Sequence, residues 1–392
     1  MVNRVVIFTG SKRDFDAYLE KDISNTEDIT RFMEVIQNYN FRLRPSNTAQ
    51  GDNEPALGNY IENCVVRAED YASVLEHVIS NFITILTLNH DIGTLYIQNP
   101  PKRVIQTLKA EFGDAIEFEG TEYSHFDKEK LRNAYAYLKE HIIGQQEAKK
   151  QVIANLYKEI GQISEKPIVI LLYGVSGVGK TETAKCISKA LGGDLLRIQF
   201  SMMQTNEAYN YIFGSEHSKS SFARDLQGRE TNIILIDEFD KVNPSFYNAF
   251  YELFDDGVYV DTNYEVDLRN SVFICTSNFM SEDEVKHVLG PAMFSRIGCC
   301  IRYNELTSAE KEIIVRRWYS ECIDKLQPEE KEIIEKSDIL DWFIKNIERF
   351  DNIRLLRTKM ENAIYQLLSE EFIFSYVDKT NSSESEEETP WN

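Results

Sequence analysis

A glycine-rich segment near the middle of the chain constrains the fold more than any other stretch. The apolar run from Val169 to Tyr173 leads directly into Gly174-x4-Gly179-Lys180-Thr181, and apolar residues then recur at helical spacing as far as Leu191. A buried strand, a glycine loop and a helix therefore follow one another in the order that a phosphate-binding loop requires. An ordinary glycine turn is the alternative interpretation, and the flanking strand and helix count against it.

Each part of this loop has its own chemical role. Backbone N–H groups of a glycine loop can curl around a phosphate, and the N-terminus of the following helix adds a partial positive charge. Lys180 can reach the outer phosphates of a nucleotide, and the Thr181 hydroxyl can ligate Mg²⁺. The predicted nucleotide-binding residues are Gly174, Val175, Ser176, Gly177, Val178, Gly179, Lys180 and Thr181.

Two acidic residues follow a second apolar run. Asn232-Ile-Ile-Leu-Ile is predicted to be a buried strand that ends in Asp237 and Glu238, and Asp237 lies 57 positions after Lys180. Asp237 can hold Mg²⁺ through water, and Glu238 can polarise the water that attacks the outer phosphate of ATP. We therefore predict that Thr181 and Asp237 form the metal site and that Glu238 is catalytic. For the acidic pair alone, a surface turn after a core strand is the alternative.

Composition limits the classes of partner. A chain of 392 residues is long enough for two or three domains. Its net charge of −21 argues against general affinity for nucleic acid, because Lys and Arg supply that affinity. The net charge does not exclude a local basic groove. No apolar run is long enough to span a membrane, and the N-terminus lacks a signal-peptide pattern, so we expect a cytoplasmic protein with no membrane contact.

The six cysteines show no spacing typical of a metal site or a disulfide framework. Cys186 and Cys275 lie in apolar patterns, which indicates reduced thiols in a core. An acidic segment, residues 377–392, contains too few apolar groups to bury and is predicted to be disordered. We interpret this tail as a solubilising end, with a docking peptide as the alternative.

The segments around the acidic pair occur in a recognisable order. Ile236-Asp-Glu-Phe-Asp-Lys-Val-Asn-Pro244 is followed by a helical segment at 245–254, by Asp255-Asp-Gly257 and by a strand that runs towards Asn278. This order resembles the ATPase module of Clp-type AAA+ protein unfoldases over residues 135–376. The resemblance implies a parallel sheet flanked by helices, a small helical domain, ATP and Mg²⁺ as ligands, and assembly into a homo-hexamer.

The resemblance also implies roles for residues that stand at the family's motif positions. They are Ile142 and Ile143 for adenine, Asn278 for sensor 1, Arg296 for the arginine finger that reaches a neighbouring subunit's nucleotide, and Arg354 for sensor 2. Taken alone, Arg296 is typical of a surface salt bridge and Asn278 of a strand cap. Their order behind the phosphate loop favours the catalytic roles.

Three departures from the family bear on function. The family grips its substrate with an aromatic residue in a pore loop, whereas the matching loop here is the shorter Ser215-Glu-His-Ser-Lys219. Nearby Tyr209, Tyr211 and Phe213 could substitute, although we interpret them as packing beneath the loop. Asn352-Ile353 replaces a Gly-Ala pair before the sensor 2 arginine. Only seventeen residues separate Asn278 from Arg296, too few for a peptidase-docking loop. ATP handling is therefore expected, threading is in doubt, and the Clp peptidase is not expected as a partner.

Residues 1–123 alternate between strand-like and helix-like segments and resemble no family. Strands are predicted at 4–10, 83–88, 94–98 and 115–119, and helices at 28–36, 68–79 and 102–112. The region is therefore predicted to be a mixed α/β domain. Gly10-Ser11-Lys12-Arg13 could hold an anion after the first strand, but a surface turn is the preferred interpretation.

The sequence thus predicts an α/β protein with an N-terminal recognition domain and an AAA+ module. The predicted divisions are 1–123, a large AAA+ domain at 124–305, a small helical domain at 306–376 and the tail at 377–392. The predicted function is ATP-driven remodelling of a protein partner that the N-terminal domain holds. The alternatives are an ATP-dependent oligomeric switch or scaffold that controls an effector, and a nucleic-acid remodeller.

Overall fold

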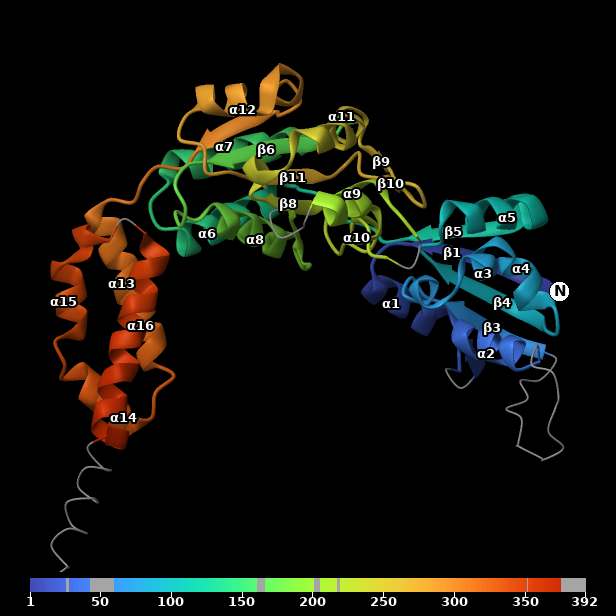
Figure 1. Cartoon of the computed structure of the whole chain (residues 1–392), viewed down its shortest axis with the longest axis horizontal. Helices are drawn as coiled ribbons and strands as arrows, with labels where there is room; N and C mark the ends of the chain where they lie inside the picture. Colours follow the sequence, from blue (N-terminus) through green and yellow to red (C-terminus); the bar gives the residue numbers. More distant parts are fainter. Residues whose placement is uncertain are drawn as a thin grey trace, which may run out of the picture.

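The computed structural model describes residues 1–25, 28–42, 60–160, 166–200, 205–216, 219–350 and 352–374. They form three parts along an elongated molecule: an N-terminal α/β region, a second α/β region in the middle, and a group of C-terminal helices (Figure 1). The predicted acidic tail lies outside the described residues, as do His217 and Ser218 of the predicted substrate loop. None of the helices in the described ranges is long and apolar enough to cross a membrane.

The N-terminal region is built on a five-stranded sheet of order β2-β3-β4-β1-β5, in which all neighbouring strands run parallel. The strands are β1 Val2–Thr9, β2 Ile29–Arg31, β3 Tyr60–Val66, β4 Asp91–Gln98 and β5 Ile116–Gly120. The helices are α1 Lys12–Asp22, α2 Phe32–Arg42, α3 Glu76–Ser80, α4 Phe82–Thr87 and α5 Lys102–Phe112, with short turns at Asp70–Ser73 and Gly113–Ala115. Parallel strands need crossover connections, and these helices supply them.

Helix α1 covers one face of this sheet, and α2 to α5 cover the other. The ring of Phe15 on α1 lies 5.4 Å from that of Phe8 on β1. Leu108 of α5 instead packs in the cluster that contains Ile7. Successive side chains of a strand point to opposite faces, so the neighbours Ile7 and Phe8 fill two separate cores.

The second sheet has the order β12-β6-β11-β8-β7, again with parallel neighbours. Its strands are β6 Ile168–Tyr173, β7 Leu196–Gln199, β8 Ile233–Asp237, β11 Val272–Thr276 and β12 Cys299–Arg302, and β9 Val258–Val260 with β10 Glu265–Asp267 form a separate antiparallel hairpin. The helices are α6 Lys128–His141, α7 Gln146–Leu156, α8 Lys180–Leu191, α9 Thr205–Phe213, α10 Phe222–Gln227, α11 Tyr247–Asp256 and α12 Glu282–Phe294, with 3-10 turns at Tyr157–Glu159, Phe239–Lys241 and Pro244–Phe246. Helices cover both faces, which explains the continuous apolar runs in β6, β8 and β11. Cys186 and Cys275 are buried free thiols, as predicted.

The C-terminal part consists of helices around a core of their own. They are α13 Ser308–Ile323, α14 Pro328–Glu335, α15 Ile339–Lys345 and α16 Ile353–Ser369, with a 3-10 turn at Ile347–Arg349 and a π turn at Glu370–Phe374. Leu356, Met360 and Ile364 recur at four-residue spacing along α16 and are fully buried, so one stripe of this helix faces the core. A capping box of Thr307 and Glu310 starts α13.

Some N-terminal predictions are wrong. Residues 83–88 were expected as a strand because they are β-branched and apolar, but α4 occupies Phe82–Thr87. Its four buried apolar residues pack on the sheet face, so tertiary packing overrides the local preference. The predicted helix at 28–36 begins instead with β2. No pattern in the sequence predicts β3, whereas β1, β4, β5 and α5 lie close to their predicted positions.

The N-terminal region contacts the middle region through several hydrogen bonds. The backbone N–H of Lys102 donates to the carbonyl of Asn263 at 2.7 Å, and Lys102 Nζ donates to the carbonyl of Asp261 at 2.6 Å. Arg224 of α10 donates to the carbonyl of Ala68 at 3.1 Å. The N-terminal region is therefore held against the β9–β10 turn and against α10.

Candidate active site

The phosphate loop spans the six residues between β6 and α8. Gly174, Gly177 and Gly179 have φ values of 136°, 88° and 102°, a region that residues with a side chain rarely adopt. At Gly174 a Cβ atom would also lie 2.2 Å from the carbonyl oxygen of Tyr303. Conformation therefore favours glycine at all three positions, and at Gly174 the available space requires it as well.

Lys180 begins α8 and folds back over the loop. Its Nζ donates to the carbonyl oxygens of Gly174 and Val175, each at 2.6 Å, and the residue is 7% exposed. Burial lowers the pKa of Lys180 to about 8, while the carboxylates of Asp240 and Asp237 oppose the shift. At neutral pH the ammonium is still mostly charged, so it can meet a phosphate in a setting with little water.

Asp237 connects three elements at the carboxyl edge of the sheet. Thr181 Oγ1 of α8 lies 3.2 Å from Asp237 Oδ1, and Thr276 of β11 donates to the same oxygen. Arg197 of β7 donates to Oδ2 through Nε at 3.0 Å and through Nη2 at 2.6 Å. The predicted metal-site residues Thr181 and Asp237 are therefore brought together by the fold.

Glu238 is held in a fixed conformation next to Asp237. Its φ of 56° is unusual for a residue with a side chain. Its backbone N–H donates to Thr276 Oγ1 at 3.0 Å, and Gln199 Nε2 donates to its Oε2 at 3.1 Å. Backbone strain of this kind accumulates at functional sites, which supports a specific role for this carboxylate.

Asn278 is placed by the strand order. Strand β11 lies between β6, which carries the phosphate loop, and β8, which carries Asp237. Because the strands are parallel, their carboxyl ends meet at one edge. Asn278 follows the end of β11 by two residues and is exposed, so it lies at the same edge as the phosphate loop and Glu238.

The segment predicted to contact adenine lies against the phosphate loop. A Cβ atom at Gly179 would lie 3.3 Å from Cγ2 of Ile142, which is 2% exposed. The carbonyl of Ile142 accepts a hydrogen bond from buried Lys149 at 2.6 Å, which fixes the segment before α7. Ile143 is partly exposed beside it.

Arg354 approaches the phosphate loop from the C-terminal helices. A Cβ atom at Gly177 would lie 2.7 Å from Cγ2 of Ile353 and 3.9 Å from Cγ of Arg354. The positive charge of Arg354 also contributes to the lowered pKa of Lys180. Asn352 caps α16 by accepting from the N–H of Arg354 at 2.9 Å. The Asn352-Ile353 pair therefore starts the helix and packs Ile353 on the loop.

Arg296 contacts residues of α11 and α12. Its Nε donates to Asp255 Oδ2 at 2.8 Å, and its Nη1 donates to the carbonyl of Ala292 at 2.7 Å. The guanidinium carbon lies 4.3 Å from the ring centroid of Tyr251 on α11. Within the described part of the chain, no hydrogen bond or ion pair joins Arg296 to the phosphate loop of its own subunit. Helix α12 fills most of the interval between Asn278 and Arg296, as the short spacing predicted.

The loop that matches the pore loop is tied to the β9–β10 turn. The N–H of Thr262 donates to the carbonyl of Phe213 at 3.1 Å, and Asn263 Nδ2 donates to the carbonyl of Ser215 at 2.8 Å. Tyr211 is buried and donates to Asp225 at 2.6 Å, so the packing prediction is confirmed for Tyr211. It is wrong for Tyr209, which is 55% exposed.

The fold presents oxygen ligands that suit Mg²⁺. Mg²⁺ is usually bound by one or two protein oxygens together with substrate phosphates and water. The Thr181 hydroxyl and the Asp237 carboxylate meet this description beside the phosphate loop. No group of three His, Cys, Asp or Glu side chains in the described ranges could hold a metal by itself, so the ion would depend on nucleotide phosphates for further ligands.

Three residues near the site were not predicted from sequence. Arg197 and Gln199 stand on β7 and reach Asp237 and Glu238 across the sheet. Asp240 is nearly buried, and its charge acts on Lys180. The β7 residues could have been suspected only from the pairing of β7 with β8, which the sequence does not reveal.

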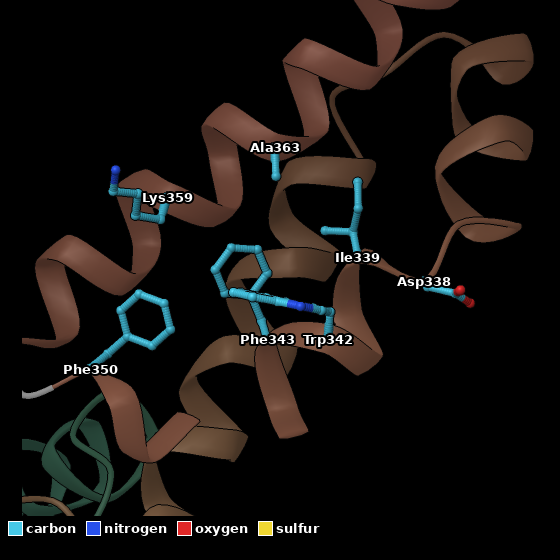
Figure 2. A pocket seen from close by; sticks show the side chains of 7 residues that line it. All are labelled: Asp338, Ile339, Trp342, Phe343, Phe350, Lys359 and Ala363. Atoms are coloured by element: carbon cyan, nitrogen blue, oxygen red, sulfur yellow. The ribbon is translucent and has the colours of Figure 1, made fainter. Parts of the chain in front are cut away.

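A separate cavity of about 620 Å³ lies in the C-terminal helices. Figure 2 shows the rings of Trp342, Phe343 and Phe350 close to one another there, and the ring centroids of Phe343 and Phe350 are 5.9 Å apart. Its lining is almost entirely apolar, with Asp338 and Lys359 as the charged members. It includes none of the predicted site residues and has no phosphate-binding character.

A comparison with protein families agrees with this geometry. Residues 165–329 match the family model described as an AAA domain of the Cdc48 subfamily. The matched stretch contains β6, the phosphate loop, Asp237, Glu238, Asn278 and Arg296. Ile142, Ile143, Arg354 and the N-terminal sheet lie outside it.

Similar curated proteins are Clp-type chaperones and disaggregases. The chain is 24% identical over 281 residues to the chaperone protein ClpB of Mycoplasmoides gallisepticum, covering 65% of this chain and 39% of that protein. It is 33% identical over 184 residues to a ClpA homolog protein of Fuscovulum blasticum, with 44% and 23% covered. It is 33% identical over 165 residues to the mitochondrial disaggregase of Homo sapiens, with 39% and 23% covered. The chain thus spans well under half the length of these relatives.

Proposed function

We propose that this chain, which carries an AAA domain of the Cdc48 subfamily at residues 165–329 and is a distant homologue of the Clp proteins, hydrolyses ATP to act on a protein partner. The observation that carries the proposal is the meeting of Thr181 with Asp237 beside Glu238 and the phosphate loop. A nucleotide-binding protein without hydrolysis would not need a strained carboxylate at this position.

Each of these residues has a separate role in the proposed hydrolysis. The loop N–H groups and Lys180 bind and orient the phosphates, and Thr181 and Asp237 hold the metal site. Glu238 accepts a hydrogen bond from the attacking water and takes its proton, with Asn278 helping to orient that water. When bound, Mg²⁺ neutralises charge on the outer phosphates. Arg354 adds positive charge from the C-terminal helices.

Arg296 is proposed to act on the nucleotide of a neighbouring subunit. Its partners in its own chain are Asp255 and Tyr251, and within the described residues no hydrogen bond or ion pair joins it to its own phosphate loop. An arginine delivered in trans completes a site only at a subunit interface. We therefore propose a homo-oligomer, a hexamer by resemblance to the Clp family.

The N-terminal region is proposed to hold the partner, and the ATPase to pull on it briefly without processive threading. Ser215 and Phe213 are tied to the β9–β10 turn, which is in turn held by Lys102 of the N-terminal region. These hydrogen bonds restrain the N-terminal end of the loop, which limits its freedom to follow a moving chain. These contacts also favour a second candidate, an ATP-dependent switch that controls an effector without unfolding it.

A fluorescent protein carrying an unstructured tag tests the remodelling proposal. The protein is incubated with ATP and a trap that captures unfolded chains, while ATP hydrolysis is followed in parallel. We expect ATP hydrolysis with no sustained loss of fluorescence. Loss of fluorescence that depends on Glu238 would show processive threading and refute this part, whereas absence of hydrolysis would refute the ATPase itself.

A further inference from the structure

The carboxyl edge of the N-terminal sheet contains a topological switch point. Strand β1 continues into α1 on one face of the sheet, and its neighbour β4 continues into α5 on the other. The loops after the two strands therefore diverge and leave a crevice between them. Open parallel α/β sheets bind their ligands in such crevices.

This crevice opens onto a cavity of about 250 Å³ that the middle region closes, here named the switch-point cleft. Figure 1 shows α10 beside the N-terminal sheet. The volume lies just below the range of about 300–1,000 Å³ for pockets that hold drug-sized ligands, which indicates a ligand of small-metabolite size. The lining residues are Lys12, Ala68, Glu69, Gln98 and Asn99 from the N-terminal region, and Ser220, Arg224, Asp225, Gln227 and Gly228 from the middle region.

The floor of the cleft is built rigidly. Asn99 has a φ of 46°, one of the few left-handed residues with a side chain among those described. Its Oδ1 accepts from the N–H of Gly10 and its Nδ2 donates to the carbonyl of Gly10, each at 2.8 Å. Gln98 also donates to this carbonyl, at 3.3 Å. Strain held in place by two buried amides is typical of a preformed binding site.

The roof provides a buried acceptor with no partner. Gln227 is 5% exposed, and its Oε1 has no hydrogen-bond partner within the described part of the chain. Its Nε2 lies 3.5 Å from the carbonyl of Glu265. A buried polar atom without a partner costs free energy, but this oxygen is enclosed by protein, so a ligand in the cleft would reach it only if the Gln227 side chain turned.

The lining carries charges of both signs. Lys12 and Arg224 form a cationic pair. Lys12 Nζ uses one of its three N–H groups on Glu69, at 2.8 Å, and Arg224 has five N–H donors for its two carbonyl partners. Glu69 and Asp225 are the acidic members, and burial raises the pKa of Asp225. A ligand with only one charge would meet repulsion from one of the two sets.

We propose that the switch-point cleft binds a small zwitterion of the α-amino acid class, with its carboxylate against the cationic pair and its ammonium donating to the acidic residues Glu69 and Asp225. Such a ligand would contact both the N-terminal region and α10. Its binding would therefore stabilise the contact between the two regions. The site is separate from the phosphate loop and needs no ATP.

Calorimetric titration of the intact chain with each of the twenty free amino acids tests the proposal. Succinate, inorganic phosphate and ethylamine serve as probes that carry one kind of charge only. We expect at least one amino acid to bind with a dissociation constant of roughly 1 mM or less. This binding should be on the order of tenfold or more tighter than that of the single-charge probes. Lys12→Gln and Glu69→Gln should each weaken this binding by about tenfold or more. Lys21→Gln, which removes the same charge from the exposed end of α1, should not.

The outcomes separate this site from the ATPase. Binding that persists in Lys180→Ala would show that the cleft works independently of the nucleotide site. The proposal is overturned if no amino acid binds, if phosphate or succinate binds equally well, or if binding survives both cleft substitutions. Because Lys12 and Glu69 are both exposed, Lys12→Gln and Glu69→Gln are expected to fold.

Discussion

The two parallel sheets of this protein both place a lysine at the start of a helix that follows a strand. Lys12 follows β1 after the two residues Gly10 and Ser11, whereas Lys180 follows β6 after a six-residue loop with three left-handed glycines. Lys12 is an exposed partner of Glu69, and Lys180 is buried against loop carbonyls. The sheet and the lysine are therefore common to both edges, and the length and conformation of the loop distinguish the phosphate site.

The start of α1 is already satisfied by its own residues. The Ser11 hydroxyl accepts from the N–H of Asp14 at 3.1 Å, and the N–H of Ser11 donates to Thr121 at 2.9 Å. Asp14 adds a negative charge in the first turn, which disfavours a phosphate bound by the backbone N–H groups of this turn. The predicted surface turn at residues 10–13 is nevertheless wrong, because Ser11 is the buried N-cap of α1 and Lys12 and Arg13 are the first residues of that helix.

The largest effect is expected from Lys180→Ala. Removing a buried charged partner of phosphate should cost about 2–5 kcal/mol of ATP binding, roughly 30-fold to several thousand-fold in affinity. Lys185→Ala on the exposed side of the same helix is the matched control and should bind ATP normally. Fluorescent-nucleotide titration measures both. If Lys180→Ala bound ATP with unchanged affinity, the buried lysine would not be what distinguishes the edge of the second sheet from that of the first.

The next prediction concerns Glu238→Gln. The amide cannot take a proton from water, so turnover should fall by about 10²–10⁴-fold. ATP affinity should stay within about threefold of the parent, because the Glu238 carboxylate is not among the groups, the loop N–H groups and Lys180, that bind the phosphates. Single-turnover hydrolysis with radiolabelled ATP separates the two quantities. Hydrolysis at the parent rate would show that another group is the base.

Arg296→Ala should lower turnover by about 10³-fold without loss of ATP binding. If Arg296 acts in trans, subunits with Arg296→Ala mixed with subunits with Glu238→Gln should regain hydrolysis, because some interfaces then contain one intact arginine and one intact Glu238. The mixture must be shown to co-assemble. A mixture that co-assembles without any recovery would place the finger elsewhere.

The smallest effect concerns the boundary between the two regions. Burial raises the pKa of Asp225 in the folded state, so the protonated form is favoured and stability falls as the pH rises from the ordinary value of about 4 through the folded pKa. The groups that face it are Tyr211, which donates to it, and Arg224. Asp225→Asn should therefore raise Tm at pH 7 by on the order of 2 °C and leave Tm at pH 4 nearly unchanged. A lower Tm at pH 7 would contradict this account of the boundary.

The sequence predicted the second sheet better than the first for a physical reason. The phosphate loop predicts β6 and α8 through glycines and charges that have few other uses, and Asp237 and Glu238 lie at and directly after the end of a strand that is buried on both faces. In the N-terminal region, residues 83–88 carry β-branched side chains that suit a strand equally well, and only packing selects the helix. Arg197 and Gln199 were missed because their importance arises from pairing across strands, which no local pattern encodes.

The central claim is that one sheet edge binds ATP and the other does not. Isothermal titration of the intact chain with ATP and Mg²⁺ measures this directly through the number of sites, repeated with Lys180→Ala. The account predicts one ATP per chain and none in Lys180→Ala. Two ATP molecules per chain, or one that survives Lys180→Ala, would contradict it.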